Sequence, residues 1–166
     1  MRRIRFWVPP LILIGCTILQ TTLLRKLSIL GATPDLSLIL LVFFANTLGS
    51  MRAQVTGFLG GIVEDVLSLS PLGFHTLIKT ITGYLFGITK GKIFIDPIII
   101  PIVLVLVASF LKAVLGILFI GLFRITVIEG AFSVKLWVEI GMNSLLAPFI
   151  FAFMKLFKVF KRAERE

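Results

Sequence analysis

The sequence predicts an all-α integral membrane protein with about six transmembrane helices. Hydrophobic residues make up 58% of the 166-residue chain, and its mean hydropathy is +1.09. Charged residues make up only 15%, whereas soluble proteins carry roughly 25%. The apolar residues come in long blocks, which indicates membrane spans rather than one large core. We therefore expect residues 1–166 to form a single polytopic membrane domain.

The first expected span covers about residues 6–24. The basic residues Arg2, Arg3 and Arg5 before it resemble the start of a secretion signal. The apolar stretch behind them is about 20 residues long, which exceeds the core of a typical cleaved signal. It also lacks a convincing small-residue cleavage site, so we expect it to be retained as a span.

The second expected span covers residues 35–48 and opens at Thr33-Pro34-Asp35. Proline is tolerated in a first helical turn, and a carboxylate favours the positive end of the helix dipole. This span and the third, at 55–69, are shorter than the roughly 20 residues that cross a bilayer. These two spans therefore cross only a thin region of the bilayer, re-enter on the same side, or extend beyond their expected ends. The remaining spans are expected at 72–89, at 98–123, which is long enough to tilt, and at 136–157.

The basic residues are distributed unevenly between the two sides of the membrane. Eleven of the 17 lie on the side that would hold both termini, four lie on the other side and two fall within spans. Cytoplasmic loops carry an excess of Lys and Arg, so both termini are expected in the cytoplasm, with residues 155–166 as a basic tail. The net charge of +9 then reflects orientation and anionic lipid rather than nucleic-acid binding.

Polar residues recur at helical spacing in the third and fourth spans. Gly57, Gly61 and Asp65 are four residues apart and share one helix face, and His75 and Lys79 repeat this spacing. The short Ser/Pro/Gly connection predicts that the two helices are antiparallel neighbours. Two interpretations of Asp65 remain open. It either pairs with His75 or Lys79 and pins the hairpin, or it contacts a partner helix or a ligand.

Other polar residues fall at membrane depth. Glu64 lies about 100° around the helix from Asp65, and we expect it to reach the outer interface. Lys112 near the middle of the fifth span is expected to pair with a carboxylate, because intramembrane charges commonly pair. Glu139 and Asn143 share a face of the sixth span. The expected intramembrane polar network comprises His75, Lys79, Lys112, Glu139 and Asn143.

The sequence offers little for catalysis or metal binding. The single cysteine, Cys16, excludes an internal disulfide, and the single histidine, His75, excludes a histidine-based metal centre. No activated nucleophile motif or phosphate-binding glycine loop is recognisable. We expect no enzyme activity and no cofactor. An aspartyl pair of Asp35 and Asp65, or a proton-coupled transporter that uses His75, stays a minor alternative.

A series of short motifs runs in fixed order through about residues 20–90. They are Thr33-Pro34-Asp35-Leu36, Gly57-Phe58, Gly60-Gly61, Asp65, Pro71-Leu72-Gly73 and Gly83-Tyr84-Leu85. In this order and spacing they resemble the MreD family, the small membrane subunit of the bacterial rod-shape (elongation) system. The remainder of the chain matches the family in length, hydropathy and basic tail.

The resemblance implies a non-enzymatic inner-membrane subunit whose fold is similar to the substrate-binding subunit of energy-coupling-factor transporters. It implies MreC, a bitopic periplasmic scaffold, and the actin-like MreB filament as partners. A RodA-type glycan polymerase and a class B penicillin-binding protein would complete the complex. A glycine-smooth face suits docking of one transmembrane helix, such as that of MreC. The expected partner or packing surface comprises Pro34, Asp35, Gly57, Gly61, Asp65, Pro71 and Gly73.

The alternative is a substrate-binding membrane subunit of an energy-coupling-factor type micronutrient importer. It would share the six-helix plan and present a polar pocket near the outer face, formed by Asp35, Asp65, His75 and Glu139. A small molecule bound after purification, or a neighbouring pair of ATPase genes in place of MreB and MreC genes, would distinguish it.

Overall fold

The computed structural model describes residues 2–22, 28, 30–68, 70–91, 98–123 and 134–156. Within these ranges the chain forms six α-helices, which confirms the expected all-α class. Most of the basic tail expected at 155–166 lies outside the described residues. The helices are α1 Arg2–Thr22, α2 Leu36–Leu48, α3 Ser50–Ser68, α4 Phe74–Gly87, α5 Ile99–Phe123 and α6 Val134–Leu156.

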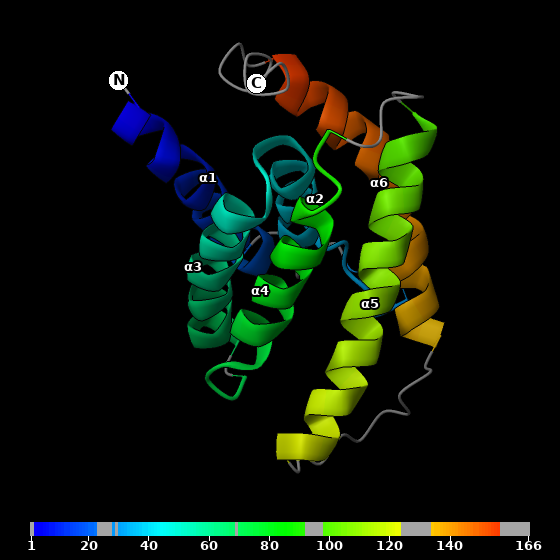
Figure 1. Ribbon diagram of the computed structural model, residues 1–166. Coiled ribbons are helices and arrows are strands. Elements are labelled where there is room, and N and C mark those ends of the chain that lie inside the picture. The colour runs from blue at the N-terminus through cyan, green and yellow to red at the C-terminus, as the bar shows by residue number, and fades with distance from the viewer. Residues whose placement is uncertain are drawn as a thin grey trace.

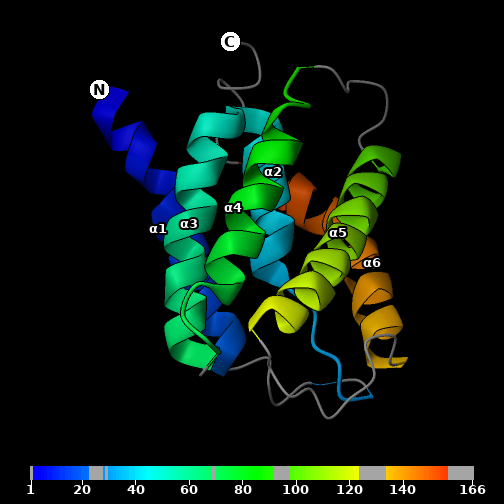
Figure 2. The same ribbon diagram turned by 60° about the horizontal axis from the view of Figure 1, so that its bottom comes forward.

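Successive helices alternate in direction. Figure 1 shows the start of α1 and the end of α6 at the same end of the bundle, and the rotated view in Figure 2 agrees. Helices α1 to α4 form one group, and α5 and α6 pack against it through α2 and α4. The ends of α1, α3 and α5 and the starts of α2, α4 and α6 therefore lie at the opposite end from the described termini.

Helix α2 lies at the centre of this arrangement and contacts each of the other five helices. Ten of its 13 residues are buried, as expected for a helix that is hydrophobic on every side. Its 13 residues span about 20 Å, which is less than the roughly 30 Å of a bilayer core. Because the neighbouring helices surround it, α2 contributes to the interior of the bundle rather than to its lipid-facing surface.

A single glycine joins α2 to α3. Gly49 has φ of 91°, a positive value that glycine adopts without steric cost. Its N–H donates to the carbonyl oxygen of Ala45 at 3.0 Å and closes α2. Helix α3 then begins at Ser50, five residues before the expected start at 55. Hydropathy missed this first turn because Ser50, Arg52 and Gln54 are polar, although all three are compatible with a helix.

Helices α3 and α4 approach so closely that their backbones touch. A Cβ atom on Gly57 would lie 2.5 Å from the carbonyl oxygen of Lys79, and one on Gly61 would overlap the Cα of Thr76. From the sequence, a partner helix was expected on this glycine face. There is no room for a partner there, because α4 of the same chain occupies it. Two glycines of α4 make the reciprocal contacts, Gly83 on Ala53 and Gly87 on Ser50.

Two of the described helices, α5 and α6, are long and apolar enough to cross a membrane by length and composition. Helices α1 and α2 contain shorter apolar segments, and α3 and α4 carry three buried charged residues, Glu64, Asp65 and Lys79. Helix α6 contains Pro148 and changes direction along its length in Figure 1. Proline removes a backbone hydrogen bond inside a helix and is a common cause of such a bend.

The α3–α4 contact predicts a position-dependent cost of adding one methyl group. Alanine at Gly61 should destabilise the protein by about 1–3 kcal/mol, because the backbone at Thr76 cannot move aside as a flexible side chain would. A Cβ atom on Gly15 of α1 would meet no other part of the chain within 4 Å, so G15A is a matched control. Unfolding in mixed micelles would measure both, and equal stability of G61A and G15A would contradict the packing.

Candidate functional site

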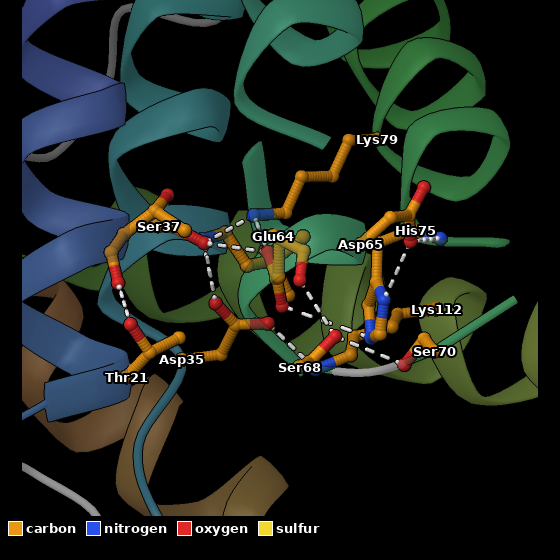
Figure 3. Close-up of polar contacts among 12 residues, drawn as sticks. Thr21, Asp35, Ser37, Glu64, Asp65, Ser68, Ser70, His75, Lys79 and Lys112 are labelled. Carbon is orange, nitrogen blue, oxygen red and sulfur yellow. Dashed lines mark hydrogen bonds and ion pairs between the residues drawn. The ribbon is translucent and has the colours of Figure 1, made fainter. Parts of the chain in front are cut away.

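All four acidic side chains in the described part of the chain belong to one polar network, and Figure 3 shows three of them, Asp35, Glu64 and Asp65. The network lies toward the end of the bundle at which α2, α4 and α6 begin. The acidic residues are Asp35, Glu64, Asp65 and Glu139.

Asp35 caps the start of α2 and connects this helix to α5 and α6. Its Oδ1 accepts hydrogen bonds from the Leu38 N–H at 3.0 Å and from the Ser37 hydroxyl at 2.9 Å. Its Oδ2 accepts from Lys112 Nζ on α5 at 2.6 Å, and its own N–H donates to Asn143 Oδ1 on α6 at 2.7 Å. Asp35 is therefore the N-cap of α2 and also its connection to α5 and α6.

Lys112 lies between two carboxylates, as expected of an intramembrane cation. Its Nζ donates to Asp35 on α2 and, at 2.7 Å, to Glu139 Oε1 on α6. Asn143 Nδ2 donates to the Ser109 hydroxyl of α5 at 3.1 Å. These contacts satisfy polar groups that would be costly to leave unpaired in hydrocarbon.

Lys79 of α4 donates to Glu64 Oε2 of α3 and to the Ser37 hydroxyl of α2. The expectation that Glu64 reaches the outer interface is wrong, because its side chain is buried. The spacing of residues in α3 indicated only the face that meets α4. It carried no information on α2, which covers the neighbouring face and brings Ser37 to Glu64. Ser37 also contacts Asp35, so it joins this ion pair to the Asp35 cluster.

Asp65 caps the first turn of α4 from the end of α3. Its carboxylate accepts hydrogen bonds from the N–H groups of Gly73 at 2.9 Å, His75 at 2.8 Å and Thr76 at 3.2 Å. The Thr76 hydroxyl adds a bond of 2.6 Å. A carboxylate at a helix N-terminus is favoured by the unpaired N–H groups and by the dipole. Asp65 therefore pins the hairpin, which was the first of the two open interpretations.

His75 bridges the two adjacent carboxylates of α3. Its Nδ1 lies 3.0 Å from Asp65 Oδ1, and its Nε2 lies 3.7 Å from Glu64 Oε1. Two basic residues were considered as partners of Asp65. His75 contacts Asp65 and also Glu64, whereas Lys79 pairs with Glu64.

The two prolines named from sequence lie outside the helices. Pro34 is buried immediately before the N-cap of α2, not within its first turn. Pro71 is exposed in the α3–α4 connection, where its carbonyl oxygen accepts from the Phe74 N–H at 3.1 Å. Both residues shape the approach to a helix start.

Several members of the network were missed from the sequence. Gln20 of α1 donates to Asp35 Oδ1 at 3.3 Å and accepts from the Ser37 N–H at 3.0 Å, so all six helices contribute to the network. Its one available signal was an amide at the end of an otherwise apolar helix. Hydroxyl residues gave no signal, because they commonly bond to their own helix backbone. The missed members are Gln20, Ser37, Glu64, Thr76 and Ser109.

The network is arranged to hold helices together. In the described ranges every buried side-chain nitrogen and oxygen has a hydrogen-bond partner. Among the same residues no group of three or more His, Cys, Asp and Glu side chains is placed to hold a metal ion. Each carboxylate contacts a lysine, histidine, hydroxyl or backbone N–H, as expected of interhelical polar contacts in membrane proteins.

Helices that alternate in direction, bury most of their acidic side chains and expose many large apolar ones are typical of a helical membrane protein. The family model described as rod shape-determining protein MreD matches residues 1–157. The chain belongs to the MreD family of rod shape-determining membrane proteins, which confirms the family suggested by the motifs. No curated protein and no solved structure matches the chain.

The Glu64–Lys79 pair predicts strong non-additivity. Lys79→Met leaves Glu64 buried without its cation, and Glu64→Gln leaves Lys79 without its carboxylate. Removing one partner of a buried ion pair costs about 3–5 kcal/mol, whereas replacing both is often far milder. A double-mutant cycle on the free energy of unfolding would measure this coupling. If the E64Q/K79M double variant lost the sum of the two single effects, the pair would not be coupled.

Proposed function

We propose that the chain is a non-enzymatic inner-membrane subunit of the bacterial cell-shape complex. In this role it packs against MreC and links the MreB cytoskeleton to peptidoglycan synthesis by the RodA-type polymerase and the class B penicillin-binding protein. The observation that carries the proposal is the family match over residues 1–157. The proposed fold relationship to substrate-binding subunits of energy-coupling-factor transporters rests on the motif resemblance.

The distribution of polar and apolar side chains supports a scaffold role. Most of the ionic network is buried between the helices, and close backbone contacts fix α3 against α4. Large apolar side chains face outward on several helices, among them Leu11 of α1, Phe110 of α5 and Phe149 of α6. A rigid helical body with apolar outer faces suits packing against single membrane helices. Since α4 covers Gly57 and Gly61, the MreC helix would dock on one of these outer faces.

The proposed orientation places both termini in the cytoplasm. It is supported by the excess of basic residues on that side and by the common end at which α1 starts and α6 ends. The connection between α3 and α4 then lies on the periplasmic side, and the α2–α3 joint lies on the cytoplasmic side.

Cysteine labelling tests this orientation. Leu72 in the α3–α4 connection is 75% exposed, and Met51 beside the α2–α3 joint is 74% exposed. In a Cys16→Ser background, Leu72→Cys should react with a membrane-impermeant maleimide in cells with a permeabilised outer membrane. Met51→Cys should react only after the inner membrane is opened. The reverse pattern would place the termini in the periplasm.

The cellular role is tested by depletion and co-purification. Cells that lose this chain should become round, the wild-type chain should restore rods, and tagged protein should recover MreC from detergent extracts. The K79M variant should restore shape poorly, and E64Q/K79M should restore it better, because the double variant leaves no lone lysine or carboxylate in that pair. Normal shape after depletion would contradict the proposal.

One observation favours the importer alternative. The side chains of His75, Lys112 and Glu139 are 17%, 24% and 26% exposed, so part of the network is accessible from outside. A micronutrient that remains bound through purification, together with loss of its uptake and unchanged shape on depletion, would support the importer. Loss of shape with uptake retained would support the scaffold.

A further inference from the structure

The helices fall into two units that are held together in different ways. In the first unit, α1–α4, the backbones of α3 and α4 touch at successive glycines. In the second unit, the α5–α6 hairpin, a Cβ atom on Gly121 or Gly141 would meet no other part of the chain within 4 Å. One on Gly116 would meet only the tip of the Phe74 ring, at 4.0 Å. Backbone contact at glycines therefore fixes α3 against α4, whereas the described glycines of the hairpin make no such contact with the first unit.

Apolar packing between the units is present but provides a weak fastening in a membrane. Phe151 of α6 packs edge to face on Phe43 of α2, with ring centroids 5.2 Å apart, and Val105 and Ala108 of α5 join the same cluster. Lipid tails are as apolar as these side chains, so the hydrophobic effect does not favour the closed arrangement over a lipid-solvated one. Polar contacts between the units therefore carry more weight than they would in water.

Two polar contacts between the units converge on Asp35. Its carboxylate accepts from Lys112 of α5, and its N–H donates to Asn143 of α6. Both groups of the ion pair also have partners within their own unit. Lys112 contacts Glu139 of the hairpin, and Asp35 contacts Ser37 of the first unit as well as the start of its own helix. Separation of the units would therefore leave neither charge without a hydrogen-bond partner.

We propose that the Asp35–Lys112 ion pair is a releasable latch between the α1–α4 unit and the α5–α6 hairpin. When the latch is closed, the hairpin is fixed against α2 and α4. When it is broken, the hairpin moves as a body, and the α1–α4 unit keeps its glycine contacts and its Asp65 cap. Because of this second set of partners each charge keeps a hydrogen-bond partner in both states, and the bond that opening costs is the one from the Asp35 N–H to Asn143. This inference is independent of the partners proposed above.

The test measures distances between spin labels in lipid nanodiscs, with the full chain in a Cys16→Ser background. Labels on exposed Leu19 of α1 and Leu85 of α4 report on the first unit. Labels on Leu19 and on exposed Val103 of α5 report across the two units. The test variant is Asp35→Asn, because asparagine is a good N-cap and keeps α2 capped while the ion pair is lost.

The expected result is that Asp35→Asn replaces a single narrow distance distribution across the units with a broad or two-peaked one. The distribution within the first unit should stay narrow. The matched control is Ser144→Ala, which removes a hydroxyl that donates to the Ile140 carbonyl oxygen within α6 and should change neither distribution. Unchanged distances across the units in D35N would overturn the latch. Broadening of both label pairs would also overturn it, because Asp35 would then support the whole fold.

A second variant approaches the latch from the hairpin. Lys112→Met leaves Asp35 and Glu139 without the cation that lies between them, and like charges at close range repel. It should broaden the distances across the units more than D35N does. The D35N/K112M double variant should give a narrower distance distribution across the units than K112M does, because one of the two carboxylates is then replaced by a neutral amide. A K112M distribution as narrow as that of the wild type would contradict the proposal.

Discussion

The arrangement of the helices depends on the cost of leaving charged side chains in hydrocarbon. Four carboxylates and two lysines of the described chain are buried or partly buried between the helices, where each needs an opposite charge or a hydrogen-bond partner. The central helix α2 is short, and its capping residue Asp35 lies within reach of α5 and α6. The same helix presents Ser37 to Lys79 and Glu64. The position of α2 therefore allows the polar groups of every helix to be satisfied together.

Two physical effects set the alignment of α3 and α4, and they agree. Gly57 and Gly61 have no side chain, so the backbone of α4 can touch α3 at these two positions. The contact is possible only in an alignment that keeps the side chains of α4 out of the way. Asp65 bonds three N–H groups at the start of α4, so a shift along the helix axis would break these bonds. Steric fit fixes the distance between the helices, and the cap fixes their alignment along the axis. Neither effect requires a hydrophobic driving force, which is absent between helices in lipid.

Sequence reasoning predicted the parts of this structure that depend on local spacing. Helical periodicity paired Asp65 with the face of α4, and hydropathy located all six helices to within a few residues except at the start of α3. Helical periodicity failed for Glu64, because the environment of this residue is set by α2, which tertiary packing brings close to it. Ser37, Gln20 and Ser109 were missed for the same reason, since a lone hydroxyl or amide carries no periodic signal. The face formed by Gly57 and Gly61 was recognised, but the helix that packs on it was expected to come from another protein rather than from α4 of the same chain.

The one-residue joint at Gly49 has a consequence for how the length of this chain can vary. A single residue joins α2 to α3, so an added residue that extended α3 at its start would rotate the rest of α3 by about 100° about its axis relative to the joint. Gly57, Gly61 and Asp65 would then turn away from α4, and Glu64 would leave Lys79. An insertion of that kind would therefore disrupt the α3–α4 contact, although the apolar content of the chain would be unchanged by it. Members of the family that keep this pairing must accommodate differences in length at other connections.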